Sequence, residues 1–245
     1  NWIDGRPTAD KTKAISGETV NGFLTEYSVA AASSLTRIPK GYTFAEAATL
    51  PCAALTAWRA LVVEGQIKMG DTVLIEGSGG MSIFALQLAK AASAEVYATT
   101  SSPAKAERLK ALGAAAVVNY REDERWGKTI SKLTDGGVDH VLDVGGGSTM
   151  KQSIEAVGVG GHIASIGILG NGRKGEITFP KLFFKQLTMS GLAVGSRAMQ
   201  QDMIRAIEQA NWRPILDRTF AFDELADAFR YQATGQHFGK IVLEW

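Results

Sequence analysis

Short apolar runs alternate with amphipathic stretches between residues 71 and 210. The runs predict strands and the stretches predict helices, because buried parallel strands are continuously apolar whereas surface helices repeat their apolar positions with the helical period. The expected strands are 72–76, 95–99, 115–118, 138–143, 162–167 and 187–192, and the expected helices are 81–92, 104–112, 122–133, 149–157 and 199–210. Strands that alternate with helices pair in parallel through right-handed crossovers, so the pattern predicts an α/β fold with a doubly wound parallel sheet.

The two ends of the chain do not continue this alternation. Before it, the pattern predicts a strand at 23–31 and a helix at 43–63, which is broken near Pro51 and capped by Thr43 together with Glu46. After Pro214 the chain shows, in order, a short segment at 218–222, an amphipathic helix at 223–232 and a strand at 240–244. We expect this tail to pack with the N-terminal strand as a second, smaller unit.

The composition is that of an ordinary globular protein. Hydrophobic residues make up 45% of the 245 residues and charged residues 21%, and 26 Lys and Arg against 25 Asp and Glu give a net charge of +1. Nothing in this balance indicates nucleic acid or an anionic membrane as a partner. Glu46 and Arg59 interrupt the most apolar stretch, the first residues have no signal-peptide layout, and Cys52 is the sole cysteine. These features favour a reducing, cytoplasmic location.

A glycine-rich turn lies between the expected strand 72–76 and the expected helix 81–92. It has the order Gly77-Ser78-Gly79-Gly80-Met81-Ser82, with Ser82 in place of a third glycine. Glycines allow a tight turn and a close backbone approach to a pyrophosphate, which the helix N-terminus then attracts. In this strand–turn–helix context the motif predicts a Rossmann dinucleotide-binding domain. The alternative is a plain structural turn in another α/β fold.

The residues after the second strand indicate which dinucleotide binds. An NAD-binding domain usually has an acidic residue about 20 positions after the turn, where it binds the ribose hydroxyls. Here the strand ends in Tyr97-Ala98-Thr99-Thr100-Ser101-Ser102-Pro103-Ala104-Lys105, which contains no carboxylate. Hydroxyls and a lysine suit a 2′-phosphate, so NADPH is favoured over NADH. The alternative is that Ser101 or Ser102 only caps the helix and Lys105 is a surface lysine.

These segments together resemble the medium-chain dehydrogenase/reductase superfamily, in particular its quinone-oxidoreductase-like and zinc-independent alcohol-dehydrogenase-like branch. The segments that carry the resemblance are 50–58, 77–82, 99–105 with Asn119-Tyr120, 143–146, 194–197 and 238–242. The resemblance implies a Rossmann domain over residues 43–213. It also implies remnants of a smaller GroES-like β domain at 1–42 and at 214–245, and relatives with a further N-terminal stretch that builds most of that domain.

The resemblance also implies a set of cofactor-binding residues. Thr56 and the stretch from Leu192 to Val194 would lie along the nicotinamide, and Gly145 and Gly167 would lie at strand ends beside the cofactor. The remaining implied contacts are Gly77, Gly79, Gly80 and Met81 at the pyrophosphate, Ser101, Lys105 and Tyr120 around the 2′-phosphate, and Phe238 and Lys240 at the closing end of the cleft.

No residue pattern predicts a metal site. Cys52 corresponds to a zinc ligand in zinc-dependent relatives, but a catalytic zinc needs three protein ligands, and His140, His162 and His237 are scattered. We expect Cys52 to be buried and inert. Asp143 is expected to orient the glycine loop that follows it rather than to take part in catalysis. Arg197 could bind phosphate or cap structure.

The resulting function hypothesis is an NADPH-dependent, zinc-independent oxidoreductase that transfers a hydride to a quinone, an enone or another carbonyl-type small molecule. Two alternatives stay open: a dinucleotide-binding module without turnover, and a remnant of a zinc-type alcohol dehydrogenase. No catalytic residue is assigned. The strand at 187–192 is expected at a sheet edge, through which a homodimer would form.

Overall fold

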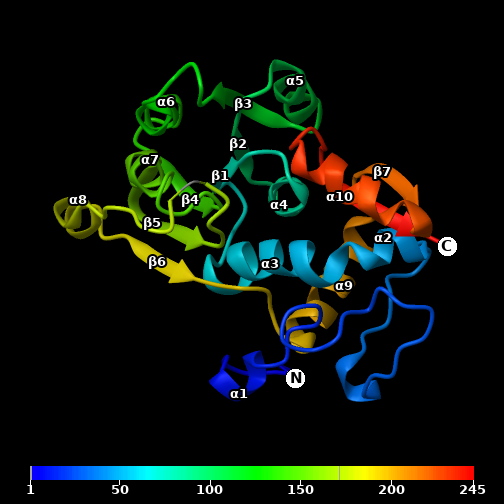
Figure 1. Cartoon of the computed structure of the whole chain (residues 1–245). Coiled ribbons are helices and arrows are strands. Elements are labelled where there is room, and N and C mark those ends of the chain that lie inside the picture. Colours follow the sequence, from blue (N-terminus) through cyan, green and yellow to red (C-terminus); the bar gives the residue numbers. More distant parts are fainter. Residues whose placement is uncertain (1, 171) are drawn as a thin grey trace.

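A six-stranded parallel sheet forms the centre of the computed structural model, which describes residues 2–170 and 172–245 (Figure 1). Its strands are β1 (Thr72–Glu76), β2 (Glu95–Thr100), β3 (Ala114–Asn119), β4 (Val138–Asp143), β5 (Val157–Ser165) and β6 (Thr188–Gly191). They lie in the order β3-β2-β1-β4-β5-β6. This is the strand order of a Rossmann fold, in which the chain starts at the centre and winds outward in both directions. The predicted fold class is confirmed.

Helices cover both faces of the sheet. They are α4 (Gly80–Ala91), α5 (Pro103–Ala111), α6 (Trp126–Leu133), α7 (Met150–Ala156) and α9 (Arg197–Ala210). The short helix α8 (Phe179–Phe184) precedes β6 and has no buried residue. Side chains alternate across a strand, so Val73 and Ile75 of β1 enter one core with α4 and α9, whereas Leu74 enters the other with α6 and α7. The central strand is therefore apolar on both faces, which is why its sequence is a continuous apolar run.

Two predicted elements within the sheet region start four or five residues from the observed position. The helix expected at 122–133 begins at Trp126 in the structure, because residues 120–125 form turns in which the Asp123 side chain accepts a hydrogen bond from the backbone of Arg125. The strand expected at 162–167 spans Val157–Ser165. Its glycine-rich first half resembles a loop in sequence, yet it pairs with β4 through an irregular register.

The long helix expected at 43–63 exists and is irregular in the middle. It consists of α2 (Phe44–Ala48), the π-helical stretch η2 (Leu50–Ala54), α3 (Leu55–Trp58) and a second π-helical stretch η3 (Arg59–Glu64). The predicted capping box is confirmed, since Thr43 accepts a hydrogen bond from the backbone of Glu46 and the Glu46 carboxylate accepts one from the backbone of Thr43. Pro51 lacks an N–H and lies at the start of the first irregular stretch.

The strand expected at 23–31 is absent, so this prediction is wrong. The segment contains no strand and lies between the short helices α1 (Ala9–Thr12) and η1 (Ala32–Ser34). Tyr27 is 89% exposed and Val29 fully exposed. A strand requires a neighbouring strand for its backbone hydrogen bonds, and none of the described residues supplies one. After η1, the carbonyl of Leu35 accepts a hydrogen bond from the Arg197 Nε.

The C-terminal tail forms a small separate sheet. Strands β7 (Leu216–Ala221) and β8 (Lys240–Glu244) pair in parallel, and η4 (Phe222–Glu224) and α10 (Leu225–Ala233) connect them. The expected helix at 223–232 therefore starts as a 3₁₀ turn. The tail was also expected to pack with an N-terminal strand. It contacts α2, and residues 23–25, which form no strand, line a pocket together with β8. Among the described helices, none has the length and apolarity to span a membrane.

Candidate functional site

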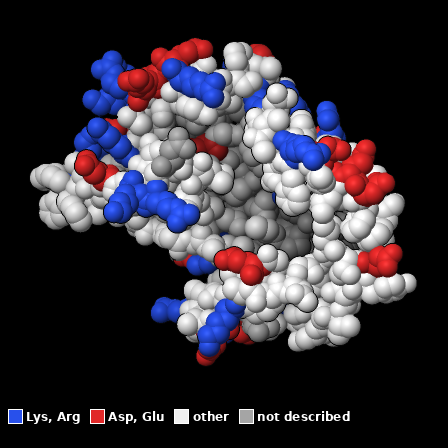
Figure 2. Space-filling model, in the orientation of Figure 1, with Lys and Arg blue, Asp and Glu red and all other residues white. Residues whose placement is uncertain are grey.

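A crevice opens at the carboxyl ends of β1, β2 and β4, the place where ligands bind in doubly wound sheets. Two adjoining pockets of about 490 and 540 Å³ line it, and Gly77, Tyr120 and Leu169 border both. The face seen in Figure 2 has a hollow at its centre, with side chains of both charges spread around its rim. We name the pocket of about 490 Å³, which Gly79, Ser101 and Lys105 line, the phosphate pocket. The pocket of about 540 Å³, which Trp126 lines, is the Trp126 pocket.

The glycine turn forms the inner wall of the phosphate pocket. Gly77 has a φ of +74°, a conformation that favours glycine, and Gly79 is extended and begins α4 without a side-chain cap. The first amide groups of a helix have no partner within it. A Cβ atom added at Gly79 would meet nothing within 4 Å. The turn thus leaves an open cradle at a positive helix end, which fits a pyrophosphate group.

The structure brings Ser101, Lys105 and Tyr120 together around the phosphate pocket. That they surround a 2′-phosphate, as the resemblance implies, stays a prediction. Between the two candidate serines, Ser102 caps α5, with its hydroxyl oxygen accepting a hydrogen bond from the backbone of Lys105. Ser101 therefore remains free of the capping role. Tyr120 is 42% exposed and stands where the two pockets meet.

Lys105 supplies the positive charge of this pocket. Its ammonium donates hydrogen bonds to the carbonyls of Gly235 and His237, at 2.6 and 2.8 Å. No carboxylate among the described residues forms a salt bridge with it. Burial lowers the pKa of Lys105. The negative charge of Asp217 raises this pKa, and the positive charge of Arg108 lowers it further. An ammonium has three hydrogens, so one remains available for an anion.

Arg108 also lines the phosphate pocket, and the sequence analysis missed it. It lies one helical turn after Lys105, so helical spacing could have revealed it. Its guanidinium lies 3.4 Å from Asp217 and 3.9 Å from the ring centre of Phe238. Because Asp217 compensates this charge, Lys105 is the stronger candidate for a phosphate ligand.

The Trp126 pocket is largely apolar, and the sequence analysis did not predict most of the residues that line it. Val144, Gly145, Leu169 and the Trp126 ring form its walls, and Glu76 and Thr149 also line it. Gly145 was predicted beside the cofactor, and it lies here at the end of β4. The charged residues that line this pocket besides Glu76 are Glu124 and Lys151.

Asp143 orients the glycine loop after β4, as predicted. The carboxylate is fully buried and accepts a hydrogen bond from the backbone N–H of Gly146 at 2.8 Å. The Thr149 hydroxyl lies 2.9 and 3.0 Å from its two oxygens. Asp143 borders neither pocket, so its role in this structure is to position the loop.

The residues predicted along the nicotinamide do not line either pocket. The Thr56 hydroxyl donates a hydrogen bond to the carbonyl of Cys52 inside its own helix. Leu192 is buried and Val194 packs against the same core. Gly167, predicted at a strand end beside the cofactor, lies two residues after β5 and also lines neither pocket; an added Cβ there would come within 2.8 Å of the carbonyl of Val144. Their contact with a cofactor stays a prediction.

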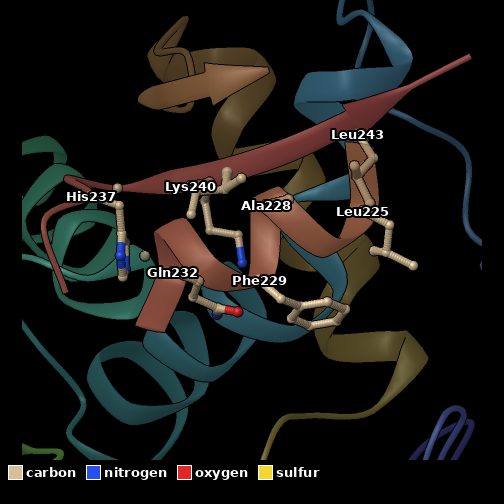
Figure 3. A pocket seen from close by; sticks show the side chains of 10 residues that line it. Leu225, Ala228, Phe229, Gln232, His237, Lys240 and Leu243 are labelled. Carbon is tan, nitrogen blue, oxygen red and sulfur yellow. The ribbon is translucent and has the colours of Figure 1, made fainter. Parts of the chain in front are cut away.

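The last predicted pair, Phe238 and Lys240, lies beside the glycine turn 77–82 and lines neither the phosphate pocket nor the Trp126 pocket. Phe238 is 1% exposed, and Gly239 after it donates a backbone hydrogen bond to the carbonyl of Ser78 at 3.0 Å. The Lys240 chain packs on Gly80, and its ammonium points into a third pocket of about 240 Å³ between β8 and α10, together with Gln232 (Figure 3). Met81 packs against the core.

The described residues do not fit a catalytic zinc. They contain no group of three His, Cys, Asp or Glu side chains that could hold a metal ion. His140 contacts Asp71 at 3.0 Å and His162 contacts the Ser190 hydroxyl at 3.0 Å. Cys52 is exposed, so the expectation of a buried cysteine is wrong. It lies in the π-helical stretch η2, in which Leu50 and Ala54 are buried.

Comparison with known proteins identifies the family. Residues 80–210, more than half of the chain, match the family model described as zinc-binding dehydrogenase. The chain belongs to the zinc-binding dehydrogenase family. The chain is also 40% identical, over its whole length, to a zinc-type alcohol dehydrogenase-like protein of Schizosaccharomyces pombe, and it spans 72% of that protein. The two matches place the chain in an oxidoreductase family of the alcohol dehydrogenase-like type.

Solved structures agree with this assignment. A structure from Sinorhizobium meliloti 1021, described as an alcohol dehydrogenase, superimposes with a TM-score of 0.92 at 39% identity; the match covers all of this chain and 72% of that one. An NAD-dependent alcohol dehydrogenase gives a TM-score of 0.87 at 34% identity, covering 95% of this chain and 68% of that one. A 2-octenoyl-CoA carboxylase reductase in complex with NADP gives 0.83 at 30% identity, covering 91% and 54%. Relatives with this fold thus use either nicotinamide dinucleotide.

Proposed function

We propose that this zinc-binding dehydrogenase homologue binds NADPH in the crevice and contributes to hydride transfer to a carbonyl-type or α,β-unsaturated acceptor. The observation that carries the proposal is Lys105, which forms no salt bridge with a carboxylate among the described residues, on a phosphate pocket that includes the open Gly79 cradle. The absence of an acidic residue after β2 supports NADPH over NADH. The reductase that binds NADP and 2-octenoyl-CoA supports an unsaturated acceptor.

When bound, the dinucleotide supplies the hydride, and the protein supplies binding and orientation. The α4 amides would hold the pyrophosphate, Lys105 and Ser101 the 2′-phosphate, and the apolar walls of the Trp126 pocket would exclude water from the bound ligand. Thr56 and Leu192 to Val194 would direct the nicotinamide. Because the described residues offer no set of zinc ligands, we propose zinc-independent chemistry. Unchanged turnover after dialysis against a chelator tests this point.

A titration of the chain with NADPH and with NADH, followed by calorimetry, tests the proposed cofactor. We expect NADPH to bind more tightly, and the Lys105→Met variant to lose about 10- to 100-fold in affinity for NADPH, since a charge-assisted hydrogen bond contributes about 1.5–3 kcal/mol. Affinity for NADH should change much less, because NADH has no 2′-phosphate. Turnover is then measured with quinone and enone acceptors, and binding without turnover would favour a dinucleotide-binding module.

The control for this experiment is Lys110→Met on the same helix. Lys110 is half exposed and pairs with Glu107, away from the pocket. This variant should bind both dinucleotides as the wild type does. If Lys105→Met weakened both dinucleotides equally, Lys105 would act through its contacts with the carbonyls of Gly235 and His237, and the 2′-phosphate assignment would be wrong.

We also propose that two copies of the chain pair through the edge strand β6. The strand lies at the end of the sheet, and Phe179, Phe183 and Phe184 of the preceding helix α8 are about three-quarters exposed. Unpaired edges and exposed aromatic side chains favour a two-fold partner. Sedimentation velocity should show a dimer that Phe183→Asp converts to a monomer, whereas Phe229→Asp on α10 leaves it intact. A monomeric wild type would contradict the proposal.

A further inference from the structure

Two buried carboxyl groups share one hydroxyl group beneath the crevice. The Ser153 Oγ lies 2.8 Å from Glu76 Oε1 and 2.6 Å from Asp143 Oδ2. Glu76 is 4% exposed, and Asp143 and Ser153 are fully buried. A serine hydroxyl has a single hydrogen, so it can donate to only one of these carboxylates. If both were ionised, the other contact would place two oxygen lone pairs against each other without a hydrogen between them.

One carboxyl must therefore carry a proton, and the surrounding donors decide which. Asp143 is surrounded by hydrogen-bond donors, since it accepts from the backbone of Gly146 and from the Thr149 hydroxyl. Such bonds stabilise the ionised form. The second oxygen of Glu76 receives only the backbone amides of Val144 and Gly145, at 3.2 and 3.4 Å. The consistent arrangement is that Glu76 donates to Ser153, and Ser153 donates to Asp143.

The same contacts connect Glu76 to the wall of the Trp126 pocket. Glu76 Oε2 holds the amides of Val144 and Gly145, and the carbonyls of these two residues in turn accept hydrogen bonds from Leu169 and Gly170. Leu169 borders both pockets. Glu76 itself lines the Trp126 pocket and immediately precedes the glycine turn.

We propose that Glu76 is a positioning residue that keeps a proton, and that through the 144–145 and 169–170 backbone it couples this proton to dinucleotide binding in the crevice. The proposal rests on the proposed function for the part that concerns the ligand. A bound dinucleotide would remove water from the pocket and bring its own negative phosphates near. Both effects favour the neutral form of Glu76, so binding in alkaline solution takes up a proton.

The groups around Glu76 place the titration of its carboxyl in a pH range that experiments can cover. Burial, followed by the charge of Asp143 on β4, raises the pKa of Glu76 to about 8. Ser153 on α7, Thr99 on β2 and the backbone of Val144 also face it, and none of these carries a charge. Glu124, Lys151 and Tyr120 line the same pocket. Lys105 lies in the neighbouring pocket, and its pKa is lowered by burial.

The proton is tested first without any ligand. Infrared spectra of the wild type at neutral pH should contain the C=O stretch of a protonated carboxylic acid, and Glu76→Gln should remove it. Asp143→Asn should shift its titration to lower pH, because the neighbouring charge is gone. The free energy of unfolding of the wild type should fall relative to that of Glu76→Gln as the pH rises from about 4.5 to about 8, since only the native protein keeps the proton in this window.

The coupling is tested by calorimetric titration with NADPH and NADH between about pH 6 and pH 9, in buffers that differ in protonation enthalpy. The dissociation constant of the wild type should rise above about pH 8, by at most tenfold per pH unit, with proton uptake on binding. In Glu76→Gln this rise of the dissociation constant with pH should vanish for both ligands. If the dissociation constant for NADPH alone still depends on pH, we assign that dependence to Lys105. The matched control is Glu124→Gln, an exposed carboxyl of the same pocket, which should keep the wild-type profile.

Each outcome separates the parts of the proposal. A missing carboxylic-acid band, or one unchanged in Glu76→Gln, overturns the proton assignment whatever the protein binds. A band together with identical pH profiles for the wild type and Glu76→Gln overturns the coupling. If neither dinucleotide binds at any pH, the proposed function fails and the coupling fails with it, while the infrared result still decides the proton.

Discussion

The Gly79→Val variant is expected to fold like the wild type and to lose dinucleotide binding. Gly79 has φ and ψ of −73° and 174°, an extended conformation open to any residue. A Cβ there would meet nothing within 4 Å. The new side chain would nevertheless project into the phosphate pocket at the start of α4, where the pyrophosphate has to approach the backbone.

The expected loss follows from the contacts that this side chain would prevent. Two hydrogen bonds from the helix amides to a charged phosphate contribute about 1.5–3 kcal/mol each, so affinity should fall by at least about 100-fold. NADPH and NADH should be affected alike, because both contain the pyrophosphate. Calorimetric titration measures the affinities, and the melting temperature should stay within about 3 °C of that of the wild type.

Gly191→Val is the matched control. Only Gly79 and Gly191 among the glycines of this chain combine an ordinary φ with no atom within 4 Å of an added Cβ. Gly191 lies at the end of β6, outside both pockets, so its variant should keep dinucleotide binding. Wild-type affinity in Gly79→Val would show that the pyrophosphate does not rest on this turn, and a collapsed fold would show that the space is not open.

The Gly239→Ala variant is expected to lower the stability of the fold strongly. Gly239 has a φ of +84°, and an added Cβ would lie 2.4 Å from the backbone carbonyl oxygen of Ile215. The positive φ costs about 1–2 kcal/mol for alanine, and overpacking against rigid backbone adds about 1–3 kcal/mol. The sum of about 3 kcal/mol corresponds to a fall of about 6–12 °C in melting temperature. A thermal melt followed by circular dichroism measures it.

The comparison is with Gly235→Ala in the same loop. Gly235 also has a positive φ, +66°, but an added Cβ would meet nothing within 4 Å. This variant isolates the conformational strain and should lose only about 1–2 kcal/mol. Gly239 holds the loop against the glycine turn through its hydrogen bond to Ser78, so Gly239→Ala should also weaken dinucleotide binding. Equal melting temperatures for the two variants would contradict the close contact with Ile215.

Local sequence patterns determined the central sheet and the turn. The strands 72–76 and 138–143 were predicted with the boundaries that the structure shows, because each lies between helices and is bounded by turn residues. The glycine turn, the Thr43 capping box and the role of Asp143 were also predicted correctly. Each of these depends on backbone conformation or on side chains within a few residues, and such information is present in the sequence.

Only the tertiary structure decided the features that depend on residues distant in the chain: strand pairing, side-chain burial and the charge state of buried groups. The segment 23–31 has the alternation of a strand but remains exposed, because no described strand lies beside it. Cys52 is exposed whereas Leu50 and Ala54 of the same π-helical stretch are buried, and only tertiary packing settles which of these positions face the core. The proton on Glu76 depends on Asp143, which is 67 positions away in the chain and becomes a neighbour only when β1 pairs with β4. A sequence specifies which groups are present, but burial and proximity set their charge state, and these arise only when the chain folds.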